Sequence, residues 1–331
     1  MIKKRMVTDL KECRTLWERL IRPKTICDLW EFRACFQRHF KRDPSFLILE
    51  DRKGIAAMLP LSYIREEDLF IFFPGETWRG KTWIERNPIY LRERGFLEEM
   101  LLSCPERTYL RYMDVADAER WPTLEPDETG YVLYPAELNF DMTSYCGRFS
   151  SKKIKSIRKT IREITAGEGF FRVNAVEDFN LIVDLNVGRF GPDSYIYDLP
   201  FRESFRDALS FLHGKGCLRM VTLEVHGQKV AVDLGALYRG RYTVFLGGTS
   251  AQFPGVAKAM NMHHIEFAFE NRLQKIDFLC GDFHWKKLWH LDVEPLYKFV
   301  TSALMTDDIM NFEKHGQFGA RPYREQLVAE A

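Results

Sequence analysis

Residues 225–290 read VHGQKVAVDLGALYRGRYTVFLGGTSAQFPGVAKAMNMHHIEFAFENRLQKIDFLCGDFHWKKLWH, and this stretch decides the fold. It opens with two apolar runs, 230–238 and 241–247, which are rich in β-branched and aromatic residues. The Arg-Gly pair at 239–240 joins them. The two runs are therefore expected to form a β-hairpin.

A helix and a short strand are expected after the hairpin. Pro-Gly at 254–255 breaks the extended pattern, and apolar residues over 256–269 then recur at helical spacing. The run 275–279 is short enough for a strand and leads into the Cys-Gly-Asp turn of 280–282. This order brings a helix start and a strand mouth to one end of a sheet, which suits a phosphate-bearing ligand. An ordinary hairpin–helix–strand unit without a ligand has the same order, so both interpretations stay open.

The composition is that of an ordinary globular chain. Its 331 residues suffice for two domains, and 46% hydrophobic residues can bury a large core. The net charge of +1 gives no general indication of nucleic acid or membrane binding. Seven cysteines without CxxC pairs fit reduced thiols better than disulfides or zinc. We expect a cytoplasmic protein without a secretory signal, a membrane span, a DNA partner or a metal.

Both halves of the sequence show the same order of predicted elements, namely two helices, three antiparallel strands, a helix and a strand. Among the predicted elements are a strand over 54–64, a helix over 91–103, a strand over 131–140 and a final strand over 297–304. RKGIAAMLPLSYIREEDLFIFFPG at 52–75 parallels HGQKVAVDLGALYRGRYTVFLGG at 226–248. Internal repetition of this kind predicts a duplicated domain. The predicted class is α+β, with a mixed, mostly antiparallel sheet flanked by helices in each of the domains 1–145 and 146–331.

A basic segment, CGRFSSKKIKSIRKTIREITA, opens the second predicted domain at 146–166. Its isoleucines recur on one face of a helix, and lysines and arginines cover much of the rest. A solvated linker helix would show this pattern. The functional interpretation is a basic wall that recruits an anionic ligand, with Lys152 and Lys153 as candidate contacts.

Four stretches together resemble the double-domain GNAT-fold acyltransferases. Within these, the chain looks most like the cellulose-biosynthesis-associated, BioF2-like acetyltransferases, with the Fem-type aminoacyl transferases as distant relatives. The four stretches are SSKKIKSIRKTIREI at 150–164, VAVDLGALYRGRYTVFLGGTS at 230–250, QFPGVA at 252–257 and IDFLCGDFHWKKLW at 276–289.

The resemblance implies two tandem GNAT-like domains, of which the first is degenerate and the second carries acyl transfer. The implied donor is acetyl-CoA or another acyl-CoA. The implied acceptor is a sugar, an amino acid or a cell-envelope precursor, as in exopolysaccharide biosynthesis. Both substrates are small molecules, and the resemblance does not fix an oligomeric state.

The resemblance also implies where the donor binds. Gln252, Gly255 and Ala257 fit the acyl-CoA signature Arg/Gln-x-x-Gly-x-Gly/Ala at the start of a helix. Backbone N–H groups at the end of the preceding strand are candidate donors to an oxyanion, although a hairpin end or bulge would use the same glycines. The predicted donor site comprises Gly247, Gly248, Thr249, Gln252, Pro254, Gly255, Val256 and Ala257.

Three residues are candidates for the chemistry. Lys286 stands where the family keeps an aromatic-Lys pair, which serves the donor or the reaction centre. Asp233 lies inside an apolar strand, where a carboxylate is costly unless paired, so it is a base, a binder of a substrate amine or half of a structural ion pair. His284 lies in the turn after the last strand and would act as a base near neutral pH. Further candidate substrate contacts are Asp282, Tyr242 and Trp285. The rings of Tyr242 and Trp285 would otherwise belong to an aromatic core.

Two other functions remain open. A Fem-like transferase would use aminoacyl-tRNA and require a basic path from Lys152 to Lys286 and Lys287. It is not favoured, because the chain lacks the long helical hairpin of those enzymes. A GNAT-fold protein without catalysis would act as a binding protein in polysaccharide biosynthesis.

Overall fold

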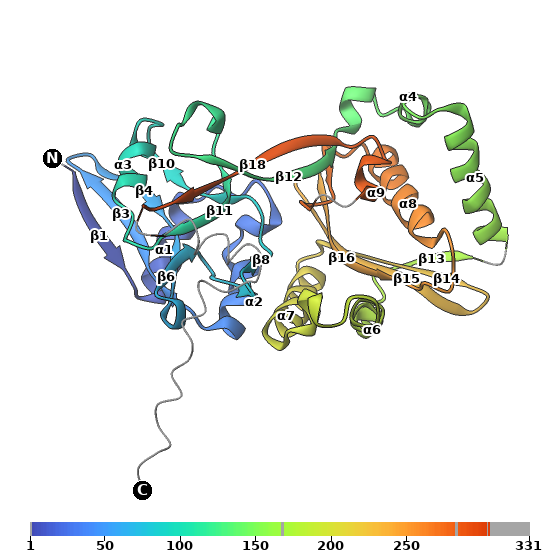
Figure 1. Cartoon of the computed structure of the whole chain (residues 1–331), viewed down its shortest axis with the longest axis horizontal. Helices are drawn as coiled ribbons and strands as arrows, with labels where there is room; N and C mark the ends of the chain where they lie inside the picture. The colour runs from blue at the N-terminus through green and yellow to red at the C-terminus, as the bar shows by residue number, and fades with distance from the viewer. Residues whose placement is uncertain (1, 167–168, 282–283, 303, 305–331) are drawn as a thin grey trace, which may run out of the picture. The chain divides into compact units, whose positions relative to one another are not determined.

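The computed structural model describes residues 2–166, 169–281, 284–302 and 304 (Figure 1). It confirms the predicted α+β class, with mixed, mostly antiparallel sheets flanked by helices. Its internal contacts divide the chain into two compact units. The first unit takes its described residues from 1–21, 40–125 and 297–331, and the second takes them from 22–39 and 126–296. These units are defined by contacts within the chain and do not test the predicted GNAT-like domains 1–145 and 146–331. Those domains stay a prediction.

The first unit contains a four-stranded antiparallel sheet in the order β1-β3-β4-β10, and a three-stranded sheet in the order β2-β5-β6. Its core packs Leu47, Leu59 and Leu110 against helix α3. Its helices are α1 (Leu10–Leu20) and α3 (Phe96–Leu102). Its strands are β1 (Lys3–Val7), β2 (Asp43–Pro44), β3 (Phe46–Asp51), β4 (Gly54–Leu59), β5 (Leu61–Ile64), β6 (Leu69–Phe72), β7 (Thr77–Trp78), β8 (Lys81–Thr82), β9 (Asn87–Pro88), β10 (Tyr90–Leu91) and β11 (Tyr109–Asp114).

Two expected elements of the first unit differ from the structure for local reasons. The strand expected over 54–64 is divided into β4 and β5 at Pro60, which lacks the N–H that a continuous ladder needs. The helix expected over 91–103 starts only at Phe96, because Tyr90 and Leu91 pair with β4 as a short strand.

The second unit contains the sheet that carries the predicted site, in the order β13-β14-β15-β16-β17-β12. All neighbours in it are antiparallel except β16 and β17. Its strands are β12 (Glu125–Leu133), β13 (Phe170–Val173), β14 (Leu218–Val225), β15 (Gln228–Tyr238), β16 (Arg241–Thr249) and β17 (Lys275–Asp277), and β18 (Asp292–Val300) continues into the first unit. Its helices are α2 (Trp30–Phe40), α4 (Met142–Gly147), α5 (Ser151–Ala166), α6 (Phe179–Phe190), α7 (Leu199–Gly214), α8 (Val256–Glu270) and α9 (His284–Lys287).

The predicted hairpin, helix and strand of 225–290 are present as β15, β16, α8 and β17. Two expected strands have other bounds in the structure. The strand expected over 131–140 stops at Leu133, because Pro135 opens a 3-10 helix. The last strand, expected over 297–304, is β18 and starts five residues earlier at Asp292.

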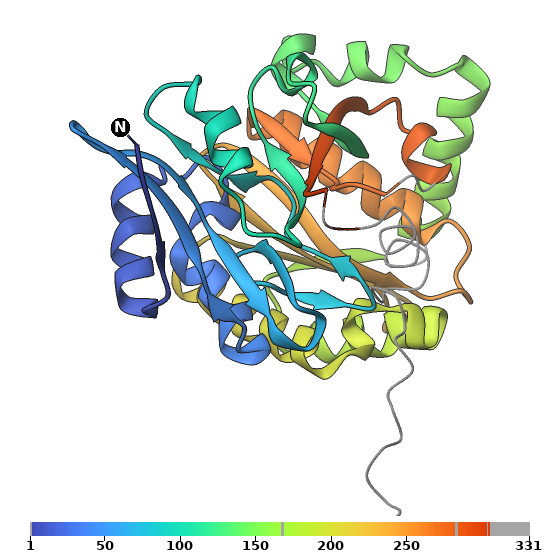
Figure 2. The same ribbon diagram turned by 60° about the vertical axis from the view of Figure 1, so that its left-hand side comes forward.

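Helices cover both faces of this sheet, with α6 and α7 on one side and α5 and α8 on the other (Figures 1 and 2). Gly247 and Gly248 of β16 face opposite sides of the sheet. A Cβ at Gly248 would meet Leu185 of α6, and a Cβ at Gly247 would meet Asp233 of β15 on the α8 side. Burial on both faces explains why β15 reads as a nearly continuous apolar run.

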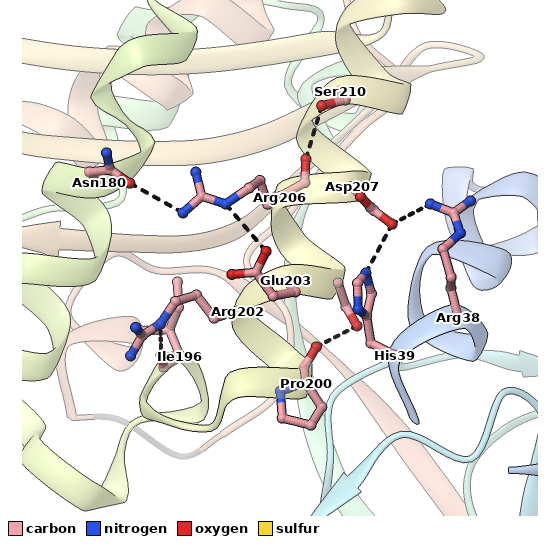
Figure 3. A network of polar contacts seen from close by, with 11 residues as sticks. Arg38, His39, Asn180, Ile196, Pro200, Arg202, Glu203, Arg206, Asp207 and Ser210 are labelled. Carbon is pink, nitrogen blue, oxygen red and sulfur yellow. Dashed lines mark hydrogen bonds and ion pairs between the residues drawn. The ribbon is translucent and has the colours of Figure 1, made fainter. Parts of the chain in front are cut away.

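Polar contacts fix α7 among its neighbours (Figure 3). Asp207 accepts a hydrogen bond from Arg38 and lies 3.0 Å from Nε2 of His39, both at the end of α2. On the other side of α7, Arg206 donates to Asn180 of α6 at 3.3 Å. These contacts hold the layer of helices against the sheet face opposite α8.

Helix α8 is apolar on most sides because it packs between the sheet and α5. Ile161 and Ile164 of α5 contact the start of α8 around Val256 and Met260. Ile154 and Ile157, nearer the start of α5, contact Met262 and other residues in the second half of α8. The two helices are therefore antiparallel. The end of α5 lies beside the start of α8.

Candidate active site

Strands β16 and β17 part early, which leaves one edge of β16 without a neighbouring strand in the described part of the chain. They pair in parallel at three positions only, from Arg241 with Lys275 to Thr243 with Asp277. β17 ends there, whereas β16 continues to Thr249. The second half of β16 thus pairs with β15 on one side and, among the described residues, with no strand on the other. This strand-free edge of β16 is called the opening below.

The ladder geometry shows which backbone groups face this opening. The Ser250 N–H donates to the Val230 carbonyl at 2.8 Å, so these two residues form a hydrogen-bonded pair. Pairs alternate along an antiparallel ladder, and Asp233 with Gly247 is therefore a non-hydrogen-bonded pair. The N–H and C=O of Gly247 consequently point away from β15, toward the opening. The side-chain amide of Asn186 confirms this direction by donating to the Gly247 carbonyl at 2.7 Å.

The start of α8 follows β16 after a short loop. Gly255 is the N-cap, at φ 90°, and its side-chain-free backbone lies against α5. A Cβ at Gly255 would lie 2.2 Å from Thr160 Cγ2, so only glycine fits both the conformation and the space. The cap has no side-chain hydrogen bond. Backbone N–H groups at such a helix start attract anions.

The residues predicted to hold a donor lie at or shortly before this helix start. One of them, Val256, differs from its neighbours in being buried. Gln252, Pro254 and Ala257 are exposed beside Gly255. The side chain of Val256 is 1% exposed and packs in the core, so it cannot contact a ligand. Thr249 accepts a hydrogen bond from Arg189 at 3.3 Å.

The basic face of α5 is exposed, as the sequence predicts. Lys152, Lys155, Arg158, Lys159 and Arg162 are exposed, and Lys153 is half-buried. Lys159 forms a weak i,i+4 ion pair with Glu163 at 3.6 Å. Because α5 ends beside the start of α8, Lys159 and Arg162 add positive charge near the predicted phosphate site.

Asp233 is hydrogen-bonded to a histidine that is not among the residues predicted for the site. Nε2 of His264 in α8 lies 2.8 Å from Asp233 Oδ2, and Nδ1 of His264 lies 2.8 Å from the hydroxyl of Tyr242. His264 is fully buried, whereas the side chain of Asp233 is 16% exposed. Tyr242 is fully buried too, and it therefore contacts this histidine as a core residue rather than lining an open pocket. The sequence contains one signal of this contact. An acid inside an apolar strand, as Asp233 is, requires a hydrogen-bond partner when it is buried.

Arg219 of β14 extends these contacts. Its guanidinium lies 3.2 Å from the centre of the Phe267 ring, 5.6 Å from the centre of the Tyr242 ring and 3.2 Å from His263 Nε2. Burial, with smaller effects from His264 and Arg219, lowers the pKa of His263 to about 4, so His263 is neutral at pH 7 and its Nε2 can accept from Arg219. Burial raises the pKa of Tyr242, which therefore keeps its proton.

Lys286 is buried and held by backbone, in contrast to the mobile charge that its place after a turn suggests. It is 2% exposed. Its ammonium donates to the carbonyls of Leu279 at 2.9 Å and Cys280 at 2.5 Å, just past the end of β17. It also lies 5.2 Å from the centre of the Tyr131 ring. The observed contacts of Lys286 hold the strand end that borders the opening.

The other candidates are placed only in part. Trp285 is 36% exposed and packs edge-on against Phe278. Asp282 and the side chain of His284 lie outside the described residues. A shallow recess of about 510 Å³ in the first unit contains none of the predicted site residues, and two ion pairs lie in its lining, Arg5 with Glu50 and Arg92 with Asp51. Among the described residues, no cluster of three His, Cys, Asp or Glu side chains could hold a metal.

Comparisons with known proteins agree with this geometry. Residues 151–287 match the family model of the acetyltransferase (GNAT) domain. The solved structure of L-PGS from Bacillus licheniformis has 11% identity and a TM-score of 0.58, over 95% of this chain and 98% of that chain. The structure of FemX has 9% identity and a TM-score of 0.56, over 90% of this chain and 97% of that chain. At such identities the likeness shows a shared fold, and no curated protein matches the sequence.

The segment 151–287, with the early parting of β16 and β17 and the helix start after β16, is a GNAT-fold acyltransferase domain. In the described part of the chain, no helix has both the length and the apolar character required to cross a membrane.

Proposed function

We propose that the segment 151–287 transfers an acyl group from an acyl-CoA, with acetyl-CoA as the simplest donor, to a small-molecule acceptor. One observation supports this proposal above the others. The N–H of Gly247 faces the opening beside β16, and Asp233, the candidate base, lies against the same glycine. A donor to a developing oxyanion and a base for the acceptor are thus adjacent.

The donor would bind along β16 and the start of α8. The helix start at Gly255, without a side-chain cap, suits its phosphates, and Lys159 and Arg162 of α5 add long-range attraction. The acyl carbonyl would then accept from the Gly247 N–H, which supplies stabilisation as negative charge develops on that oxygen. Lys286 would support this site indirectly, by holding the end of β17 that forms the other border of the opening.

The proposal names the acceptor by its chemical class only. The resemblance to BioF2-like acetyltransferases favours a sugar, an amino acid or a cell-envelope precursor, as used in exopolysaccharide biosynthesis. Acyl transfer to such a compound requires a base that removes a proton as the new bond forms. Asp233 is the group for which the geometry supports this role.

A second candidate function rests on the exposed lysines of α5 and on the fold shared with FemX and L-PGS. A Fem-like enzyme would draw its donor from aminoacyl-tRNA, whose phosphates the basic face of α5 would attract. The continuous basic path that this function requires is interrupted, because Lys286 is buried against Leu279 and Cys280. A role in binding without catalysis is the third possibility.

Titration calorimetry of the full chain separates the three. We expect acetyl-CoA to bind with one site per chain, and charged tRNA to bind only weakly and with a steep dependence on salt. Tight, saturable binding of charged tRNA with no binding of acetyl-CoA would favour the Fem-like function. Binding of neither donor would favour the role without catalysis.

A further inference from the structure

A side chain of α6 reaches the backbone of β16 at the opening. Asn186 donates from Nδ2 to the Gly247 carbonyl at 2.7 Å, and its helix lies on the sheet face opposite α8 (Figure 1). The helix packs closely at this point, because a Cβ at Gly248 would lie 2.6 Å from Cβ of Leu185 and 3.4 Å from the backbone nitrogen of Asn186. Any side chain at position 248 would push α6 and this amide away from the strand.

The other end of the Asn186 side chain is held by the segment between α6 and α7. Asn186 Oδ1 accepts from the hydroxyl of Ser194 at 2.6 Å. Ser194 is 5% exposed, and its Oγ accepts in turn from the N–H of Ile196 at 3.2 Å. A carbonyl oxygen can only accept, so the amide nitrogen faces Gly247 and the amide oxygen faces the hydroxyl, which donates. The contacts thus assign one orientation to the amide and fix it at both ends.

A fixed Gly247 carbonyl matters for the proposed reaction. In a strand, the N–H and C=O of one residue point to the same side, so both groups of Gly247 face the opening. An oxyanion that accepts from this N–H would therefore have the partial negative charge of the carbonyl oxygen as a neighbour. Donation from Asn186 offsets this charge and prevents the peptide group from turning. A donor of fixed direction stabilises developing charge without reorganisation.

We propose that Asn186 is a positioning residue for acyl transfer. It keeps the Gly247 N–H directed at the acyl oxygen and reduces repulsion from the Gly247 carbonyl, while Ser194 holds it in place. The inference rests on the proposed function and extends the site from β16 to α6 and the segment that follows it. In this role Asn186 touches no reacting atom. Its effect should therefore appear at the acyl carbonyl and not in the affinity for coenzyme A.

Three variants remove the contacts of Asn186 in different ways. Asn186→Leu keeps most of the volume without the hydrogen bonds. Asn186→Asp keeps the shape but sets a carboxylate against the Gly247 carbonyl, and Ser194→Ala removes only the far contact. Asn180→Asp is the matched control, because Asn180 is exposed on the same helix and accepts from Arg206 at 3.3 Å, as an aspartate also can.

Infrared spectra of bound acetyl-CoA, labelled with 13C at the thioester carbonyl, report the polarisation of the acyl oxygen without an acceptor. We expect the wild type and Asn180→Asp to lower the stretching frequency of this carbonyl equally, relative to free acetyl-CoA. Asn186→Leu should lose about half of this shift and Asn186→Asp more, because the donor no longer has a fixed direction. Ser194→Ala should lie between Asn186→Leu and the wild type. Calorimetry should give one Kd for coenzyme A, which has no acyl group, in the wild type and all variants.

A full wild-type frequency shift in both Asn186→Leu and Asn186→Asp would overturn the inference. So would a loss of affinity for coenzyme A in these variants as large as their loss of affinity for acetyl-CoA, because Asn186 would then support the donor site as a whole. Melting temperatures of the variants show whether each one is folded.

A measurement without ligand tests the contact itself. Gly247 and Gly248 are the only pair of adjacent glycines in the sequence. Protein labelled with 13C-carbonyl, 15N glycine therefore gives one carbonyl–amide cross-peak, which reports the Gly247 carbonyl. We expect its 13C resonance to move upfield in Asn186→Leu and to stay in place in Asn180→Asp, and an unmoved peak in Asn186→Leu would overturn the inference. A peak that moves in a chain that binds no acetyl-CoA would show that the proposed function fails, and the inferred role would fail with it.

Discussion

The carboxylate of Asp233 occupies the space that any side chain at Gly247 would need, because a Cβ there would lie 1.6 Å from Asp233 Oδ1. Gly247→Ala should therefore displace Asp233, cost about 1–3 kcal/mol of unfolding free energy as overpacking does, and abolish most turnover. Urea denaturation and thiol release from acetyl-CoA measure the two effects.

Gly188 in α6 is the matched control for that substitution, because no atom lies within 4 Å of its ideal Cβ. Gly188→Ala should stabilise the chain by about 0.4–1 kcal/mol through the unfolded state and leave turnover unchanged. A Gly247→Ala variant that behaved in the same way would show that the space beside Asp233 is not constrained.

Lys286→Met should destabilise the chain rather than leave its stability unchanged. The substitution keeps the buried volume but removes both hydrogen bonds to the Leu279 and Cys280 carbonyls, at a cost of about 1–3 kcal/mol for buried polar groups left without a donor. Lys287→Met, at an exposed neighbouring position, should change stability by less than about 0.5 kcal/mol. Equal melting temperatures for the two variants would contradict this account of Lys286.

The folded chain should lose stability between pH 6.5 and pH 4 because of His263. Burial lowers the pKa of this residue from 6.5 to about 4, so in that window the unfolded chain binds a proton that the folded chain does not. Stability is thus fully present above pH 6.5 and decreases as pH falls, by up to about 3 kcal/mol at about 1.36 kcal/mol per pH unit. His263→Gln should remove this part of the pH dependence. Identical slopes for the variant and the wild type would contradict it.

Charge reversal on α5 should weaken donor binding without unfolding the chain. Lys159 is exposed on the part of α5 that borders the start of α8, and Lys53 is exposed in the first unit. Lys159→Glu should raise the Kd for acetyl-CoA about 3- to 10-fold at low salt, and by less at high salt as screening increases. Lys53→Glu is the control. If Lys159→Glu and Lys53→Glu raised the Kd equally, the effect would come from the net charge of the chain and not from the position of Lys159 on α5.

The sequence predicted the elements around the donor site because their signals are local. Pro254-Gly255 marks a helix start by its own backbone, and the glycine pair of β16 lies at the end of a clear hairpin. The partnership of Asp233 with His264 has no local signal, since 31 positions separate them and the bond exists only when α8 packs on β15. The sequence did not predict the burial of Lys286 either. Its carbonyl partners, at Leu279 and Cys280, are placed by the way the chain turns after β17, and no residue pattern marks that turn.

A crystal structure of the full chain with coenzyme A bound tests the central claim most directly. The account predicts phosphate oxygens at the N–H groups of the α8 start beside Gly255, and the thiol end of the ligand along β16 at the Gly247 N–H. Coenzyme A bound in the first unit, or bound away from both β16 and the start of α8, would contradict it.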